Sequence, residues 1–160
     1  MYNKSLNSSS GSYNTKKRAI QNIDNGAAVS RTLTDAESGT LYLVDMSAVD
    51  NNVAITLPTA SGSEGVWYDF CFTVDCDDDA DFSVSTGADG TDIYGYIVCG
   101  AANSTVDDVD GLSKITVDGS VAQSTEGMRF SFLCDGTNWH LSGYNATAIG
   151  TVLIVESGSA

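Results

Sequence analysis

The feature that most constrains the fold is an alternation of apolar and polar residues, which recurs in short segments along the chain. It is clearest in residues 53–57, 66–74 and 128–134, where nearly every second side chain is apolar. Successive side chains of a β-strand point to opposite faces of the sheet, so this pattern is typical of strands with one buried face. No segment has a convincing helical period, and the pattern therefore predicts a chain of strands.

Nine segments are predicted to be strands, namely residues 40–46, 53–57, 66–74, 82–86, 93–99, 114–117, 128–134, 137–142 and 151–156. Clusters of Gly, Asp, Asn and Ser separate them at intervals typical of a sandwich or barrel. We expect an all-β fold, an antiparallel β-sandwich of jelly-roll-like arrangement, and the pattern is equally compatible with other sandwich topologies. Asp135-Gly136 lies between two alternating segments and predicts a hairpin with a type I′ turn.

Charged residues divide the chain into two parts. Residues 1–31 contain five basic side chains and one acid, whereas residues 32–160 contain two basic side chains and twenty acids. We therefore expect a flexible basic N-terminal arm, residues 1–31, joined to an acidic sandwich body, residues 32–160. The cations available to the arm for contacts with a partner are Lys4, Lys16, Lys17, Arg18 and Arg31. The acidic body would repel nucleic acid and anionic membranes, so neither is an expected partner.

The chain starts without the apolar stretch of a signal peptide, and no apolar run approaches the roughly 18 residues of a membrane span. We therefore expect a protein that is made and retained in a cytoplasm, or released from it by lysis. Cys71, Cys76, Cys99 and Cys134 lack the spacing of a zinc site. Buried free thiols are the favoured interpretation in a reducing compartment, and a disulfide framework is the alternative.

Two groups of residues raise the question of metal and acid–base chemistry. Asp77, Asp79 and Asp81 have the initial spacing of a calcium loop, but the glycine and glutamate of that loop are missing. Solvated carboxylates are therefore the favoured interpretation, as for the second acidic segment, residues 107–111, and a structural calcium ion is the alternative at either loop. No cofactor is expected. His140, the single histidine, faces outward from its predicted strand without a nucleophile motif, so no catalytic residue is expected. A hydrolase triad assembled from distant residues stays open as an alternative.

The aromatic residues and the C-terminal apolar run each have two interpretations. Most of the aromatic side chains would fill the core, or they would form a sugar-binding platform on the surface; they are Trp67, Tyr68, Tyr94, Tyr96, Trp139 and Tyr144. The unbroken apolar run comprises Val152, Leu153, Ile154 and Val155. At an exposed sheet edge such a run would pair with strands of other molecules, so we expect it to be central in a sheet or buried in an oligomer interface.

Taken in order, several segments resemble those of a known class of proteins. They are SGT before LYLVD (38–45), ITLP (55–58), GVWYDFCFTV (65–74), IYGYI (93–97) and FLCDGTNWHLSG (132–143). This order is similar to that of small β-rich virion proteins of tailed bacteriophages, namely capsid decoration (cement) proteins and related head-fibre or appendage modules. The resemblance covers about residues 32–143, and it lies in structural motifs rather than in catalytic ones.

The resemblance implies a non-enzymatic virion protein that is assembled in the host cytoplasm and binds the capsid exterior. Its expected partners are the major capsid protein and copies of itself, with a homotrimer favoured over a dimer. The arm would then become ordered across the shell, because an extended segment reaches far but loses entropy on binding. The alternative within the same class is a fibre or appendage protein that contacts a host surface or a glycan.

Overall fold

The computed structural model describes residues 18–48, 51–76, 79–87, 91–99, 106–119, 125–145 and 153–156. Within these ranges twelve strands form two sheets, accompanied by a short 3-10 turn at Asp35–Glu37. The strands are β1 (Ile20–Asp24), β2 (Val29–Thr32), β3 (Leu41–Asp45), β4 (Val53–Thr56), β5 (Trp67–Phe72), β6 (Phe82–Ser85), β7 (Ile93–Cys99), β8 (Val106–Leu112), β9 (Lys114–Val117), β10 (Arg129–Cys134), β11 (Trp139–Asn145) and β12 (Leu153–Glu156).

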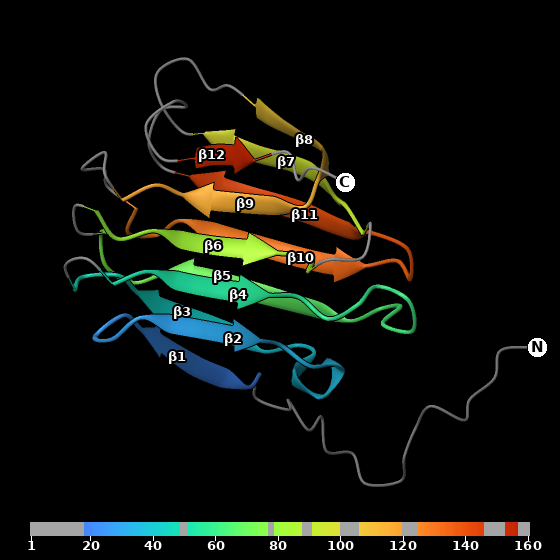
Figure 1. Cartoon of the computed structure of the whole chain (residues 1–160), viewed down its shortest axis with the longest axis horizontal. Coiled ribbons are helices and arrows are strands. Elements are labelled where there is room, and N and C mark those ends of the chain that lie inside the picture. Colours follow the sequence, from blue (N-terminus) through green and yellow to red (C-terminus); the bar gives the residue numbers. More distant parts are fainter. Residues whose placement is uncertain are drawn as a thin grey trace, which may run out of the picture.

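In its first half the chain crosses from one sheet to the other after every strand. β1, β3 and β5 are parallel neighbours in a seven-stranded sheet of order β1-β3-β5-β10-β11-β7-β8. β2, β4 and β6 are parallel neighbours in a five-stranded sheet of order β12-β9-β6-β4-β2. The first six strands therefore wind as a flattened coil. Figure 1 shows β1 and β2 at one end of the stack, with β8 and β12 at the other.

The expected all-β sandwich is confirmed, but the expectation that its strands pair only antiparallel, as in a jelly roll, is wrong. Among the described strand pairs, five are parallel and five are antiparallel. For the four parallel pairs among the first six strands, the physical reason is the crossing between layers. A chain that leaves a sheet, passes through the other layer and returns enters the first sheet in its original direction, whereas a hairpin reverses it.

The nine predicted strands are all present, and β4, β5 and β10 bury every second side chain as predicted. Phenylalanine rings from the two sheets meet in the core: Phe72 of β5 lies edge-on to Phe82 of β6 with ring centroids 5.1 Å apart. Phe70 also contacts Phe82, at 5.6 Å, and Phe132 of β10, at 5.9 Å. These rings are almost completely buried. Edge-to-face contacts of this kind add to the hydrophobic stabilisation of the sandwich.

The hairpin predicted at Asp135-Gly136 exists and joins β10 to β11, but its turn is not of type I′. The connection spans residues 135–138, and the N–H of Asp135 donates to the carbonyl of Asn138 at 3.1 Å. Gly136 has a φ of 92°, whereas Asp135 lacks a positive φ. The Oδ1 atom of Asp135 instead accepts the N–H groups of Thr137 and Asn138, at 2.8 and 2.7 Å. These side-chain bonds favour a four-residue loop over the two-residue turn.

The boundary predicted at residue 31 is wrong, because residues 20–24 and 29–32 are strands of the sandwich. β1 extends the seven-stranded sheet beside β3, and β2 lies at the edge of the five-stranded sheet beside β4. Ile23 is buried in the core, although most side chains of β1 and β2 are exposed or half-buried. The basic charge of this segment is a property of its side chains, and it does not indicate whether the backbone pairs in a sheet. Residues 1–17 lie outside the described ranges.

Candidate functional site

The outer face of the seven-stranded sheet carries a groove above its four central strands, β5, β10, β11 and β7. The groove has a volume of about 510 Å³. Strand pairing places its residues in two rows across the sheet. The first row contains Trp67, Leu133 and His140, and the second contains Asp69, Ser131, Ser142 and Tyr96. The volume falls within the range of small-molecule sites, about 300–1,000 Å³.

Large apolar side chains stand on this face without being buried. Trp67 is 39% exposed, Leu133 is 49% exposed and Tyr96 is 50% exposed. All three line the groove, with Trp67 on β5 and Tyr96 on β7 at opposite sides. Tyr144 of β11 is equally exposed, at 48%, but does not line the groove. The groove is therefore a place where aromatic surface is open to a ligand.

Arg18 holds one side of the groove in place. Its guanidinium carbon lies 4.4 Å from the ring centroid of Trp67, and its Nε donates to the carbonyl of Gly39 at 2.9 Å. The same guanidinium forms an ion pair with Asp69, and the hydroxyl of Ser131 donates to Asp69 as well. Because the cation contacts both the ring and the carboxylate, the indole of Trp67 and the charge of Asp69 have a fixed arrangement.

His140 and Asp135 form a second polar pair beside the groove. The Nε2 atom of His140 lies 2.7 Å from Oδ2 of Asp135. This contact, together with the N–H groups of Asn138 and Thr137, lowers the pKa of Asp135 to about 2. In the described residues no hydroxyl is hydrogen-bonded to the other ring nitrogen of His140. The serine–histidine–carboxylate order of a hydrolase triad is therefore not assembled among these residues.

Gly95 lets β7 lie close against β11. It has a φ of 147°, a backbone conformation that residues with a side chain rarely adopt, and it pairs with Leu141 in the parallel register. A Cβ at this position would lie 1.9 Å from the carbonyl oxygen of Leu141. The GY pair of the IYGYI segment therefore has two separate roles: Gly95 permits the close strand pairing, and Tyr96 faces the groove.

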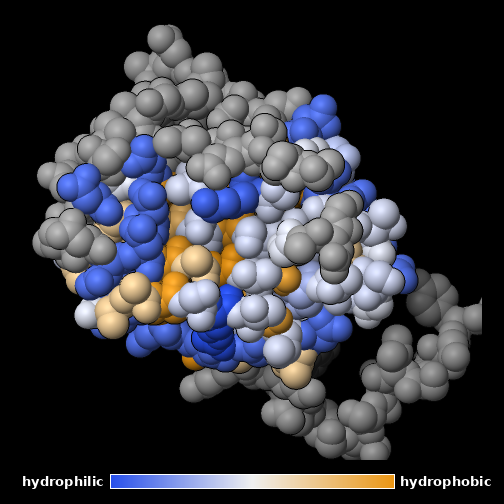
Figure 2. Space-filling view, viewed as in Figure 1, coloured by the Kyte–Doolittle hydropathy of each residue, from blue (hydrophilic) through white to orange (hydrophobic). Residues whose placement is uncertain are grey.

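The opposite face, formed by the five-stranded sheet, has a different character. Its outward positions carry mostly small side chains in two rows; they are Ser30, Ala54, Ser83 and the buried Thr116, then Thr32, Thr56, Ser85 and the longer Lys114. Figure 2 looks onto this side and shows pale, weakly polar side chains with apolar ones visible between them. Large aromatic side chains among the described residues are exposed on the seven-stranded sheet instead. The two faces therefore offer different chemistry, and the aromatic groove belongs to one of them.

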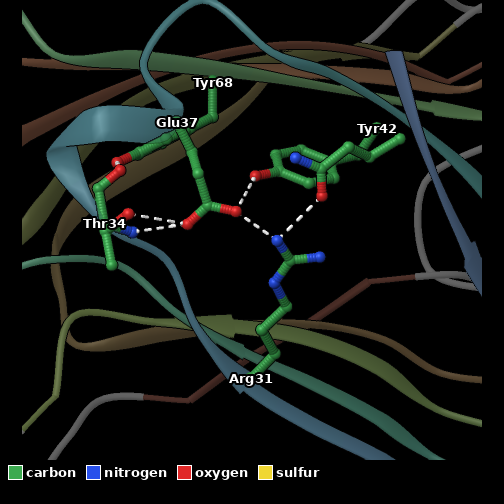
Figure 3. A network of polar contacts seen from close by, with 6 residues as sticks. Arg31, Thr34, Glu37, Tyr42 and Tyr68 are labelled. Carbon is green, nitrogen blue, oxygen red and sulfur yellow. Dashed lines mark hydrogen bonds and ion pairs between the residues drawn. The ribbon is translucent and has the colours of Figure 1, made fainter. Parts of the chain in front are cut away.

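A polar network ties β2 to the short turn and to β3 (Figure 3). Arg31 forms an ion pair with Glu37, whose Oε1 also accepts the hydroxyl of Tyr42 at 3.2 Å. The Oε2 atom of Glu37 accepts the N–H and the hydroxyl of Thr34, both at 2.9 Å. Burial raises the pKa of Glu37, but Thr34 and Arg31 outweigh it, and the pKa lies below its ordinary value. Burial and the nearby Glu37 charge raise the pKa of Tyr42 to about 12.

The five cations assigned to the arm do not act as one group. Lys4, Lys16 and Lys17 lie outside the described ranges. Arg18 is bound at the groove, and Arg31 belongs to the network with Glu37, so both contact the sandwich itself. Sequence reasoning missed these contacts because the ion-pair partners are far away in the sequence, at Asp69, or belong to a turn that the alternation does not reveal.

The candidate interface and calcium residues are described only in part. Val152 and Asp77 lie outside the described ranges; Leu153, Ile154 and Val155 belong to β12, an edge strand that pairs with β9. Asp81 accepts the N–H of Gly119 at 3.2 Å, and Asp79 is exposed with a φ of 69°. The described residues contain no cluster of three metal-ligating side chains.

The predicted thiols and aromatics are distributed as follows. Cys71, Cys76 and Cys134 are free, and the last two are buried, as expected, whereas Cys71 is half-buried. Burial raises the pKa values of the Cys76 and Cys134 thiols. The side chain of Cys99 is outside the described residues.

Of the six aromatic candidates, Tyr68 and Trp139 are in the core, whereas the side chains exposed on the outer face are Trp67, Tyr96 and Tyr144. Tyr94 is half-buried.

The polar half of the groove was not predicted. Asp69, Ser131 and Ser142 alternate with the buried residues of β5, β10 and β11, and the same periodicity places them outward. They could have been found from their outward-facing positions in the alternation, if the order of the strands had been known. The order itself depends on the insertion of the β10–β11 hairpin beside β5, which periodicity does not reveal.

Comparisons with protein-family models, with curated proteins and with solved structures found no match. The part of the chain that the structure describes contains no helix with the length and hydropathy that a bilayer crossing requires.

Proposed function

We propose that this chain is a non-enzymatic structural protein of a tailed-phage virion, which binds the outside of the capsid and stabilises it. The observation that carries the proposal is a basic terminus attached to an acidic sandwich. Residues 1–17 contain three lysines and no acid, whereas the complete chain has a net charge of −14. The basic segment ends directly before Arg18, which is bound to Trp67 and Asp69. A cationic segment that is joined to the sandwich at Arg18 suits contact with an acidic or polar shell.

The motifs that carry the resemblance have structural roles, which agrees with a non-enzymatic protein. The ITLP segment meets the DG-x-x-W hairpin in the core, where Nε1 of Trp139 donates to the carbonyl of Pro58 at 3.2 Å. The buried ring of Trp139 also stacks on Tyr68 with centroids 5.8 Å apart. These residues hold the two sheets together. The partners under this proposal are the major capsid protein and further copies of the chain, with a trimer favoured.

Co-sedimentation with expanded capsid shells of the parent phage tests the proposal. The full chain should bind saturably, and removal of residues 1–17 should weaken binding and make the remaining binding less dependent on salt. The truncation stops before Arg18, because β1 and β2 belong to the folded body. A full-length variant with Lys4, Lys16 and Lys17 changed to Ser is the matched control for charge without loss of length. Absence of binding by the full chain would refute the decoration role.

A second candidate function is a fibre or appendage protein of the virion that contacts a host surface. The specific observation that favours it is the groove on the seven-stranded sheet, where Trp67 and Tyr96 are open to solvent. Localisation by labelling of intact virions separates the two candidates: decoration predicts label over the whole head, and an appendage predicts label at a vertex or on the tail.

A further inference from the structure

We propose that the groove on the outer face of the seven-stranded sheet binds a short, neutral saccharide. The inference rests on the second candidate function, contact with a host surface, and adds to it a class of ligand and the residues that bind it. Three observations support it: the size of the groove, its pairing of aromatic and hydroxyl groups, and a lining that contains no lysine or arginine among the described residues.

The dimensions of the groove suit more than one sugar ring. Trp67 lies on β5 and Tyr96 on β7, and β10 and β11 lie between these two strands. Three steps of strand spacing, each about 4.8 Å, separate the two outer strands by roughly 14 Å. The volume of about 510 Å³ extends over this width. A short oligosaccharide can therefore contact both sides of the groove, whereas a single ring contacts one.

The kinds of group in the groove correspond to the two surfaces of a sugar. The C–H faces of a pyranose ring are apolar and pack on aromatic rings. Tyr96 offers such a ring, and Trp67 offers the part of its indole that Arg18 leaves exposed. The hydroxyl groups of the sugar need donors and acceptors between those rings. Ser131 and Ser142 lie there in one row with Asp69. The hydroxyl of Ser131 donates to Asp69 and keeps lone pairs that can accept a hydrogen bond from a ligand.

The charges in the groove favour a neutral ligand. Asp69 is paired with Arg18, Asp135 is hydrogen-bonded to His140, and the described residues that line the groove contain no lysine or arginine. An anionic ligand such as nucleic acid would meet two carboxylates and would need cations that are already bound. A purely apolar ligand would cover the hydroxyl groups of Ser131 and Ser142 and remove their hydrogen bonds to solvent, which costs free energy.

The groove is built from strands rather than loops, so little ordering is needed on binding. Ser131 and Ser142 face each other across an antiparallel pair, and β7 is fixed beside β11 by the close approach at Gly95. A ligand that meets a preformed site loses less free energy to side-chain ordering. The site is nevertheless open to solvent on one side, so we expect dissociation constants in the millimolar range. Binding of this strength is sufficient where many copies of the protein contact the same surface together.

Tryptophan fluorescence provides the test, because the two tryptophans of the chain have opposite environments. Trp67 is 39% exposed in the groove, and Trp139 is completely buried. The full chain is titrated with the methyl glycosides of glucose, galactose, mannose and N-acetylglucosamine, and with their neutral trisaccharides. At least one trisaccharide should give a saturable change and bind more tightly than its monomer. Absence of a saturable change with every neutral saccharide of this panel overturns the proposal.

Two variants distinguish binding in the groove from non-specific binding to the exposed face of the sheet. Tyr96→Ala should lower the association constant about five- to tenfold, because it removes one aromatic contact. Tyr144→Ala is the matched control, since Tyr144 is equally exposed on the same face and does not line the groove. Equal losses in the two variants overturn the assignment of the site. Both variants are first checked for an unchanged thermal transition.

The same variants keep this inference distinct from the capsid proposal. Tyr96→Ala should co-sediment with expanded shells as the unmodified chain does, because the proposed shell contact is the basic terminus. Saccharide binding without shell binding would refute decoration and leave the groove as a host-contact site. Shell binding without saccharide binding would overturn the groove assignment alone.

Discussion

Replacement of Glu37 by glutamine changes one atom of the chain and tests the polar network of Figure 3. The carboxylate of Glu37 accepts four hydrogen bonds, two at each oxygen, from Arg31, Tyr42 and the N–H and hydroxyl of Thr34. An amide has one oxygen and one NH₂ group, so at least one of the two donor pairs then faces another donor. The variant keeps the size of the side chain, and it removes only the charge and half of the acceptor capacity.

The size of the effect follows from the number and kind of bonds. A hydrogen bond to a charged group contributes about 1.5–3 kcal/mol and a neutral one about 1 kcal/mol. Two bonds are lost or reversed and two are weakened, but Arg31 and Glu37 keep 33% and 19% of their side-chain surface exposed, so solvent reduces the penalty. We expect a loss of about 2 kcal/mol, which lowers the melting temperature of a domain of this size by about 4–8 °C.

The loss should depend on pH in a defined direction. The pKa of Glu37 is lower in the folded chain than its ordinary value of 4.5. A lowered pKa means that the folded state favours the carboxylate, so this stabilisation is present above the unfolded-state pKa and is lost as the pH falls through the folded-state pKa. The difference in stability between the parent chain and Glu37→Gln should therefore be full near neutral pH and should decrease below about pH 4.5.

Urea denaturation at a series of pH values, followed by fluorescence and circular dichroism, measures this difference. Glu64→Gln is the control, because it removes the same charge from an exposed side chain. The control should change stability by less than about 0.5 kcal/mol. Equal stability of the two variants near neutral pH would refute the role of the network. A Glu37→Gln deficit that stays constant into strong acid would refute the assignment of its origin to the carboxylate.

Three further predictions concern the terminus, the hairpin and the sheet. Deletion of residues 1–17 should leave the thermal transition unchanged, whereas deletion of residues 1–31 removes β1 and β2 and should abolish cooperative unfolding in calorimetry. Because contact with His140 and two backbone N–H groups lower the pKa of Asp135 to about 2, an NMR titration of the His140→Ala variant should show that pKa moved toward its ordinary value. Gly95→Ala should destabilise the chain by more than about 2 kcal/mol in urea denaturation, since the added Cβ meets backbone and the φ is positive; an unchanged midpoint would contradict the close strand approach.

The strands that the sequence predicted are those with enough apolar residues to show a period. β5 and β10 alternate over their complete length, and their inward residues are all buried. β1 buries only Ile23, and β8 reads VDDVDGL, so neither contains the run of apolar residues that the pattern requires. Strands at the ends of a sheet need fewer buried side chains. Sequence periodicity therefore identifies central strands better than edge strands.

The pairing of the strands could not be predicted, since alternation records which face a side chain occupies and not which strand lies beside it. The same limit applies to the groove. Trp67 and Tyr96 were identified as candidate aromatics, yet their positions on opposite sides of one groove depend on β10 and β11 lying between β5 and β7. Ser131 and Ser142 had no sequence signal of their own, because an outward serine in a strand is ordinary.

The hairpin that separates β5 from β7 also determines the order in which the chain can assemble. The first six strands pair with neighbours made shortly before or after them, and these pairs can form early during synthesis. β5 and β7 each keep one unpaired edge until residue 145 has been made and β10 and β11 enter the sheet. During that interval a nascent chain exposes two strand edges that match a hairpin of identical sequence from another copy. Exchange of this hairpin between chains is therefore the misassembly that the topology most favours.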